Sequence, residues 1–418
     1  MFKTNKKIYH DDDEKTLKIN IRGKYYDDGL LIYDGESKNN KRNGYGKNYI
    51  NGLLLYEGEW KNNKYDGHGK YYNGDELIYV GEFKDNKYNN NGKYYEGGKL
   101  IYEGGFKNDK GNGFGKYYEG GELIYEGEWK DNKCNGNGKK YFDGKIIYEG
   151  EFKNNEKNGN GKYYKDIIIY EGEFKNNKRN GKGKYYYDGN IIYTGEWRDN
   201  NCNGKGKEYN IDGELIYKGE WKDNKRNGYG KYYDDDELIY KGEWIDSKRN
   251  GYGKYYVDNE LIYKGEWIDS KRNGNGKYYN KGFLIYEGEW RDNKRNGNGK
   301  YYDKGFLIYE GEWRDNKRNG YGKYYDKGFL IYEGEWRDNK RNGYGKIIYD
   351  ERKSEDYKII EYEIKDDDLC LICMTEKKSI AFIPCGHLCI CEGCLKKYKD
   401  NKCIMCRKEF SISNKIFF

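Results

Sequence analysis

The sequence predicts an all-β chain, built as an elongated antiparallel β-hairpin solenoid and followed by a small cysteine-rich domain. Three observations support this fold class. A unit of about 23 residues recurs fourteen times, apolar and polar residues alternate within it, and eight of the ten cysteines fall in the last 49 residues. A fixed period in the twenties indicates a repeat architecture, in which stacked units bury a shared core.

The composition limits what the core and the surface can be. Apolar residues make up 35% of the chain, against about 45–50% in ordinary globular domains. Tyrosine, with 52 copies, must therefore supply much of what is buried. The charges are mixed, 79 basic against 72 acidic for a net charge of +7. This balance is unlike a strongly basic nucleic-acid binder, so we expect no nucleic-acid partner.

Each unit reads as a β-hairpin, as in "YEGEWRDNKRNGNGKYYDKGFLI" at residues 286–308. In "LIYEGEW", Leu307, Tyr309, Gly311 and Trp313 alternate with Ile308, Glu310 and Glu312, which is the period of a strand. The segment "DNKRNG" predicts a turn at its Asn-Gly step, and "GYGKYY" predicts the second strand. The glycines of that strand recur beside aromatic positions, so we expect them to make room for a tyrosine or tryptophan ring.

The repeated segments "YEGEW" and "KRNGYGKY", with their 23-residue period, resemble the MORN repeat. The first residues of the fourteen units are Tyr33, Tyr56, Tyr79, Tyr102, Tyr125, Tyr148, Tyr170, Tyr193, Tyr217, Tyr240, Tyr263, Tyr286, Tyr309 and Tyr332. The resemblance covers residues 21–348 and implies a β-solenoid that serves as a scaffold, with a protein substrate or an anionic phospholipid as its partner.

Lys-Arg pairs recur at the expected turns, as at Lys294-Arg295 and Lys317-Arg318. If every turn points the same way, these pairs form a positive ridge suited to an anionic membrane. The alternative is that they are solvated tips, balanced by nearby carboxylates. Two cysteines, Cys134 and Cys202, stand at the tenth position of their units, where we expect exposed thiols and no metal.

The first residues, "MFKTNKKIYHDDDEK", contain no apolar segment typical of a secretory signal. No aliphatic run approaches the ~20 residues that a membrane span needs. We therefore expect a cytoplasmic protein, peripheral to a membrane if the ridge binds lipid and in the host cytoplasm if the source is a virus. Its cysteines should be reduced, and a cluster of them is then more consistent with metal binding than with disulfides.

The cysteine-rich segment has the spacing C-x2-C, x11, C-x-H, x3, C-x2-C, x8, C-x2-C. Eight ligands suffice for two closed tetrahedral zinc sites. The ligands are Cys370, Cys373, Cys385, His387, Cys391, Cys394, Cys403 and Cys406. Cys389 has the C-x2-C spacing with no other cysteine, so it is the spare thiol.

This ligand order resembles the C3HC4 RING finger, whose cross-braced pairing implies two Zn²⁺ ions. Carried over, Cys370, Cys373, Cys391 and Cys394 hold the first zinc. Cys385, His387, Cys403 and Cys406 hold the second. Within this family, "PCGHLCICEGC" and the terminal "KIFF" are most similar to the RING of inhibitor-of-apoptosis proteins.

The RING resemblance implies an E3 ubiquitin ligase, an enzyme that positions a ubiquitin-loaded E2 conjugating enzyme without a covalent intermediate on the RING. Ile372 matches the apolar contact to the E2, and Arg407 matches the cationic linchpin that bonds both E2 and ubiquitin. The alternative function is a non-enzymatic scaffold or membrane-associated adaptor, in which the RING only binds partners. An autoubiquitination assay distinguishes the two.

The expected organisation is a tail at 1–20, the repeats at 21–348, a linker at 349–368 carrying a short strand or helix, the RING at 369–410 and a tail at 411–418. Clustered apolar side chains in "SISNKIFF" suggest a contact surface. The resemblance implies a RING homodimer through this tail, with Phe417 contacting the ubiquitin held by the partner subunit. The alternative is that the tail packs on its own RING or on the linker.

Overall fold

The computed structural model describes residues 21–349, 358–364, 380–381, 388–390 and 416–417. Every described element is a β-strand, and the chain divides into two compact units at Gly213/Glu214. Within these described ranges there is no helix with the length and apolar character that a membrane crossing requires.

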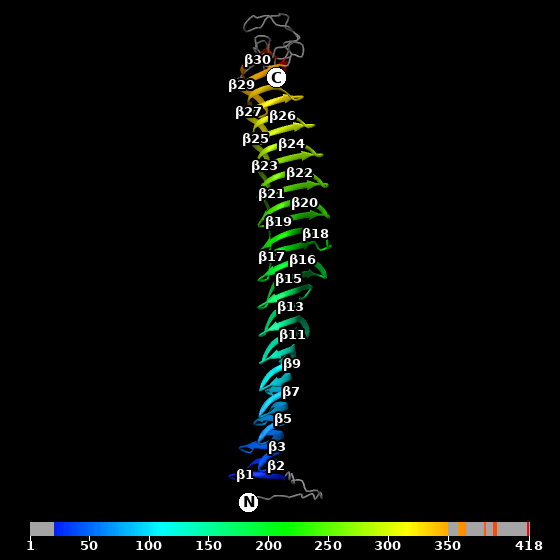
Figure 1. The fold of residues 1–418 in the computed structure, drawn as a ribbon, viewed down its shortest axis with the longest axis vertical. Coiled ribbons are helices and arrows are strands. Elements are labelled where there is room, and N and C mark those ends of the chain that lie inside the picture. Colours follow the sequence, from blue (N-terminus) through cyan, green and yellow to red (C-terminus); the bar gives the residue numbers. More distant parts are fainter. Residues whose placement is uncertain (1–20, 350–357, 365–379, 382–387, 391–415, 418) are drawn as a thin grey trace. The chain divides into compact units, whose positions relative to one another are not determined.

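The first unit is an antiparallel meander in which each strand pairs with the next along the chain. Figure 1 shows these strands in chain order. They are β1 (Ile21–Asp27), β2 (Leu30–Lys38), β3 (Lys41–Ile50), β4 (Leu53–Lys61), β5 (Lys64–Asn73), β6 (Glu76–Lys84), β7 (Lys87–Glu96), β8 (Lys99–Lys107), β9 (Lys110–Glu119), β10 (Glu122–Lys130), β11 (Lys133–Phe142), β12 (Lys145–Lys153), β13 (Glu156–Lys165), β14 (Ile168–Lys175), β15 (Lys178–Tyr187), β16 (Asn190–Arg198) and β17 (Asn201–Tyr209).

The second unit continues the same pattern of nearest-neighbour antiparallel pairing up to β30. Its strands are β18 (Leu215–Lys222), β19 (Lys225–Asp234), β20 (Glu237–Ile245), β21 (Lys248–Val257), β22 (Glu260–Ile268), β23 (Lys271–Asn280), β24 (Phe283–Arg291), β25 (Lys294–Asp303), β26 (Phe306–Arg314), β27 (Lys317–Asp326), β28 (Phe329–Arg337), β29 (Lys340–Tyr349) and β30 (Lys358–Ile364). Three short strands follow, β31 (Ile380–Ala381), β32 (Leu388–Ile390) and β33 (Ile416–Phe417).

The predicted all-β hairpin fold is therefore confirmed, and β30 shows that the segment expected to be a linker contributes a strand. β30 pairs antiparallel with β29 along seven residues, from Gly343↔Ile364 to Tyr349↔Lys358. The sheet consequently extends one strand beyond the last hairpin of the repeat pattern.

The turn of each hairpin lies at a pair of Asp, Asn or Ser residues, most often Asp-Asn, rather than at the Asn-Gly step that the sequence suggested. Between β26 and β27, Asp315 and Asn316 have φ values of 49° and 70°. Positive φ at both central residues is the signature of a type I′ turn, whose twist matches that of the flanking strands. Lys327 and Gly328, with φ values of 50° and 87°, form the corresponding turn between β27 and β28.

The Asn-Gly step lies inside the second strand and forms a bulge. Opposite Glu312 the register shifts, because Gly311 pairs with Gly322 and Trp313 pairs with Arg318. Gly320 has a φ of 70° there, a conformation that glycine adopts readily. The Glu312 carboxylate accepts a hydrogen bond from the Tyr321 N–H at 3.0 Å, which satisfies a donor that the bulge removes from the ladder.

The core is a line of tyrosines, each lying across a pair of glycines, as the sequence predicted. Tyr309 is completely buried, and its ring covers the facing residues Gly311 and Gly322. A Cβ on Gly322 would lie 2.5 Å from the Tyr309 Cζ, so no larger residue fits without displacing the ring. The Tyr309 hydroxyl donates to the carbonyl of Glu312 at 3.0 Å.

Within each unit of the fold, a tryptophan or a phenylalanine joins one tyrosine to the next. The Tyr309 ring meets Trp313 of its own unit edge-on at 5.2 Å and Trp336 of the next unit at 5.4 Å. These distances are favourable for T-shaped aromatic pairs. The Trp336 indole N–H donates to the carbonyl of Gly322 at 3.3 Å. Each unit is thus packed mainly against its neighbours, which explains why one hairpin would not be stable alone.

Candidate functional site

The cysteine-rich segment contains a small antiparallel sheet with the strand order β32, β31, β33. Ile380 pairs with Ile390 and Ala381 with Leu388, so β31 and β32 form the central hairpin. β33 adds to the other edge of β31, with Ile380 opposite Phe417 and Ala381 opposite Ile416. The spare thiol of Cys389 belongs to β32, between two residues that pair with β31.

The predicted site residues of this segment lie outside the described residues, except Phe417. Those outside are Cys370, Ile372, Cys373, Cys385, His387, Cys391, Cys394, Cys403, Cys406 and Arg407. The backbone of Phe417 pairs within its own chain, which is the intrachain arrangement that the sequence left open as an alternative. The homodimer and the contact of Phe417 with ubiquitin stay predictions.

The described repeats contain a second set of chemically notable residues, a row of cations enclosed by the aromatic core. The Arg295 guanidinium lies 4.4 Å from the Trp313 ring, 5.5 Å from Tyr301 and 5.7 Å from Tyr286. Its Nη2 donates to the carbonyl of Asn316 in the next turn at 3.1 Å. Burial lowers the pKa of Arg295 from its ordinary value. We call this arrangement of two tyrosines and the next unit's Trp or Phe the aromatic cage.

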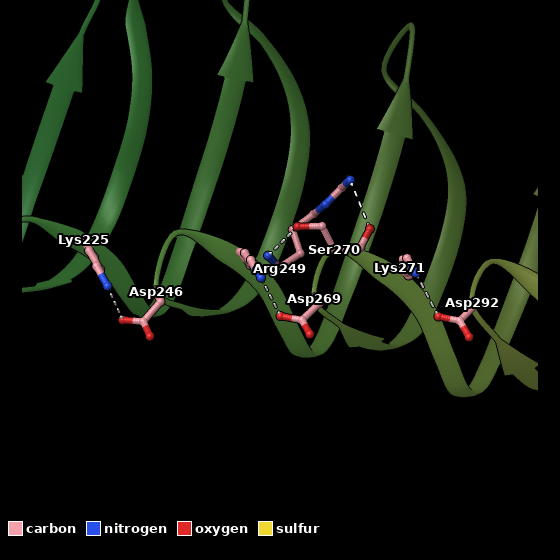
Figure 2. Close-up of polar contacts among 8 residues, drawn as sticks. Lys225, Asp246, Arg249, Asp269, Ser270, Lys271 and Asp292 are labelled. Carbon is pink, nitrogen blue, oxygen red and sulfur yellow. Dashed lines mark hydrogen bonds and ion pairs between the residues drawn. The ribbon is translucent and has the colours of Figure 1, made fainter.

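Beside six of the eight caged arginines, from Arg179 to Arg318, the preceding lysine lies at the surface and is paired with an aspartate of the next turn. Figure 2 shows this ladder in the second unit, with Lys225 Nζ 3.3 Å from Asp246 and Lys271 Nζ 3.1 Å from Asp292. Arg249 is drawn between them and bonds the backbone carbonyl of Ser270 through Nη2 at 3.4 Å. The same pairing recurs in the first unit, for example between Lys64 and Asp85 at 2.7 Å.

These contacts correct the expectation of a positive ridge formed by Lys-Arg pairs. The arginines are enclosed by rings, and the lysines face carboxylates, so neither member of the pair is a solvated, uncompensated charge. The positive ridge was the reason to expect an anionic membrane as a partner, and that reason no longer holds. The sequence contains a pattern that indicates this ladder but did not enter the prediction. Each such lysine is followed by an aspartate 21 residues later.

Cys134 and Cys202 are not the exposed thiols that the sequence suggested. Both occupy the position of the caged arginine and are partly buried. Burial raises the pKa of Cys134 to about 11 and that of Cys202 to about 12, so both are neutral thiols at physiological pH. Such thiols are poor nucleophiles and poor metal ligands, because the thiolate is the reactive form.

The opposite face of the sheet is polar. Its charges are paired in some units, whereas lysine faces lysine in others, as at Lys231↔Lys241 and Lys254↔Lys264. Lys277 lies 2.7 Å from Glu287, which also accepts a hydrogen bond from the Tyr302 hydroxyl at 2.7 Å. These two donors hold the pKa of the Glu287 carboxyl below its usual range. The cross-strand pairs line a hollow of about 720 Å³ in the second unit. With both charge signs alternating, this hollow shows no preference for one sign of ligand.

The hairpin array and the cysteine-rich segment together define a repeat scaffold joined to a zinc-finger module. The sequence model of the MORN repeat matches fourteen segments, which begin at residue 33 and end at residue 351. Since these segments cover more than half of the chain, the chain belongs to the MORN-repeat family. The model described as "Zinc finger, C3HC4 type (RING finger)" matches residues 366–412, and a finger of this type implies zinc binding.

The RING finger is similar to those of curated E3 ubiquitin ligases. The chain is 37% identical over 57 residues to Mitochondrial E3 ubiquitin protein ligase 1 of Drosophila melanogaster, covering 14% of this chain and 17% of that protein. It is 51% identical over 41 residues to Probable E3 ubiquitin-protein ligase LUL4 of Arabidopsis thaliana, covering 9% of this chain and 11% of the relative.

An inhibitor of apoptosis is also among the relatives, as the sequence predicted. The Apoptosis inhibitor IAP of Cydia pomonella granulosis virus is 38% identical over 58 residues, which are 14% of this chain and 20% of the viral protein. The chain thus spans a fifth or less of the length of each of these relatives. The similarity concerns the RING finger and does not extend to the relatives' other domains.

Proposed function

We propose that this protein is a RING-type E3 ubiquitin ligase whose MORN repeats recruit a protein substrate. The observation that carries the proposal is the C3HC4 RING match, together with relatives that are themselves named E3 ubiquitin ligases. The proposed site of action is the cytoplasm, where E2 conjugating enzymes and ubiquitin are available. The repeats supply a long surface of similar units, which suits a scaffold better than a catalyst.

The donor set of the segment fits two zinc ions, since it offers seven thiolates and one imidazole in four pairs. Cys370, Cys373, Cys391 and Cys394 would hold one ion. Cys385, His387, Cys403 and Cys406 would hold the other. Bound zinc supplies folding free energy to a segment too small to fold on a core of its own.

The proposed ligase acts by orientation, because no RING residue becomes a nucleophile. Ile372 would contact the E2, and the guanidinium of Arg407 would hydrogen-bond both the E2 and its ubiquitin. Arginine suits this role because its planar fork presents several donors in fixed directions. Holding the ubiquitin thioester in one reactive pose removes orientational freedom before the reaction, which lowers the barrier to aminolysis.

Autoubiquitination with a panel of E2 enzymes tests the proposal. The full chain should form ubiquitin conjugates with at least one E2, and Ile372→Ala and Arg407→Ala should each reduce the rate at least about tenfold, a barrier change of about 1.4 kcal/mol. Lys408→Ala is the matched control, because it removes a neighbouring positive charge without touching the linchpin position. Absence of conjugates with every E2, by a protein that retains two zinc ions, would leave the non-enzymatic scaffold as the function.

The proposed ligase is a homodimer in which Phe417 reaches the ubiquitin bound to the partner subunit. The pairing of β33 with β31 places the backbone of the tail at the edge of the small sheet of its own chain. Phe417→Ala should slow ubiquitin discharge and leave zinc content unchanged. A monomer by light scattering at tens of micromolar, or undiminished discharge by Phe417→Ala, would restrict the tail to a structural role.

A further inference from the structure

One position of the repeat decides whether the aromatic cage is filled. This is the tenth residue of each unit, which enters the cage from the second strand of the hairpin. Arginine fills it at Arg42, Arg179, Arg226, Arg249, Arg272, Arg295, Arg318 and Arg341. Lys157 fills it as a cation 4.3 Å from the Tyr163 ring. Tyr65 and Tyr88 fill it by stacking on Tyr56 and Tyr79 at 3.8 and 3.9 Å.

The fourth unit has the cage but not the side chain that fills it, because Gly111 stands at this position. Tyr102 meets Trp129 edge-on at 5.2 Å and 86°, and Tyr117 lies 6.3 Å from Trp129 at 55°. The corresponding pairs around Arg295 are 5.5 Å at 86° and 6.2 Å at 51°. The rings therefore keep the arrangement that encloses a guanidinium elsewhere.

Side-chain exposure shows that this cage is open. Trp129 is only partly buried, whereas Trp313 beside Arg295 is 6% exposed. Tyr102 is 7% exposed, against 1% for Tyr286. The rings line a hollow of about 640 Å³ that also includes Ile101 and Ile124. A guanidinium occupies only part of that volume, which leaves room for apolar atoms attached to it.

One hydrogen-bond acceptor of the open cage suits a cation. The carbonyl of Asn132 corresponds to that of Asn316, which accepts the Arg295 Nη2. The backbone around it is the same, since Gly111 N donates to Asn132 Oδ1 at 2.6 Å as Arg295 N donates to Asn316 Oδ1 at 2.8 Å. Gly111 has no side chain to reach that carbonyl.

The charge of the fourth unit also departs from the repeat in the direction that a cation requires. Asp109 lines the hollow, and it stands where every other unit has asparagine or serine. The one basic residue lining the hollow is Lys140, which belongs to the fifth unit, next to Cys134. The Asp109 carboxylate accepts a hydrogen bond from the Tyr88 N–H at 2.8 Å, so the acidic end of the hollow lies on the side of the third unit and the basic end on the side of the fifth.

We propose that the hollow at Gly111 binds an arginine side chain of a partner polypeptide. The guanidinium occupies the cage formed by Tyr102, Tyr117 and Trp129, where the ring faces attract a cation. It donates to the Asn132 carbonyl, and the Asp109 carboxylate that lines the same hollow favours its positive charge. The aliphatic stem and the neighbouring peptide residues cover Ile101 and Ile124. This interaction surface does not depend on ligase activity, and it gives the repeats one specific docking position.

The test uses the full chain and a fluorescein-labelled pentapeptide that carries one arginine between leucines. Fluorescence anisotropy should show binding at least about tenfold tighter than for the same peptide with citrulline, whose neutral urea has nearly the shape of a guanidinium. Gly111→Arg should abolish binding, because it fills the cage as eight other units do. Gly111 does not have a positive φ, so the substituted arginine can adopt the conformation that Arg295 has. Asp109→Asn should weaken binding about threefold.

A gain-of-site variant provides the matched control. Arg295→Gly empties the cage of Tyr286, Tyr301 and Trp313 and should create a second, weaker site for the arginine peptide. Far-ultraviolet circular dichroism checks that each variant keeps its strands. Equal binding of the citrulline peptide, or undiminished binding by Gly111→Arg, would overturn the proposal. Free L-arginine binding as tightly as the peptide would overturn the assignment of a polypeptide partner.

Discussion

The repeats place two adjacent basic residues in opposite environments, and exchanging each for alanine separates their contributions to stability. Arg249 is partly buried, with its guanidinium 4.6 Å from the Trp267 ring and its Nη2 3.4 Å from the Ser270 carbonyl. Lys248 is exposed and makes a 3.0 Å ion pair with Asp269. We therefore expect Arg249→Ala to destabilise the surrounding hairpins and Lys248→Ala to have little effect.

The expected magnitudes follow from these contacts. A partly desolvated cation–π contact contributes about 1 kcal/mol, and a long hydrogen bond adds about 0.5 kcal/mol, so Arg249→Ala should cost about 1.5 kcal/mol. Both members of the Lys248–Asp269 pair have side chains about 60% exposed, at 59% and 64%. Solvent screening then limits that pair to about 0.5 kcal/mol or less.

Hydrogen exchange followed by mass spectrometry is the suitable assay, since a repeat array need not unfold in one step. Protection of amides in β20–β23 should fall about tenfold in Arg249→Ala and by less than about threefold in Lys248→Ala. Arg249→Lys should recover part of the protection, as Lys157 occupies the same cage in another unit. If Lys248→Ala loses as much protection as Arg249→Ala, the cage does not stabilise the repeat as we infer.

Three further predictions concern glycine, pH and zinc. Gly276→Ala should lower the free energy of unfolding, measured by urea titration, by about 1–3 kcal/mol, because the added methyl displaces a buried tyrosine. A smaller loss than that of the turn variant Gly282→Ala in the same titration would contradict this. Burial lowers the pKa of Lys157 to about 8, so the folded state favours the neutral amine. Local stability by hydrogen exchange should therefore rise between about pH 8 and pH 10, the unfolded lysine titrating near 10.4, and Lys157→Met should remove the rise. Cys389→Ser should retain two zinc ions per chain by metal analysis and Cys391→Ser should lose about one, while zinc loss in Cys389→Ser would refute the ligand assignment.

The sequence predicted the hairpin fold and the role of the paired glycines because both depend on local pattern. The alternation around Tyr309 indicates which face is buried, and a glycine beside an aromatic position indicates where a ring lies. It did not predict the turn, since Asp315-Asn316 and Asn319-Gly320 are both compatible with positive φ. The choice between them depends on register. Tyr309 needs Gly311 opposite a second glycine, and that requirement moves the turn to the Asp-Asn step.

The caged arginines were missed for a related reason. From sequence alone, Lys317 and Arg318 are adjacent basic residues beside a turn, and nothing local indicates that one faces rings and the other solvent. Their environments depend on the tyrosine and tryptophan of two different units, which the register aligns. The assignment of the zinc ligands stays a prediction, which rests on the C-x2-C spacing and on the resemblance to the RING finger.

Compensation of charge within the repeats bears on how such a scaffold achieves specificity. Where the lysines face aspartates and the arginines lie between rings, one unit presents nearly the same surface as the next, so a partner that contacts the shared pattern could bind at many positions. A single docking position must come from a unit that departs from the pattern. The fourth unit departs at two positions that line one hollow, with Gly111 opening the cage and Asp109 adding a negative charge to the lining. Together the two changes form a site complementary to one cationic side chain.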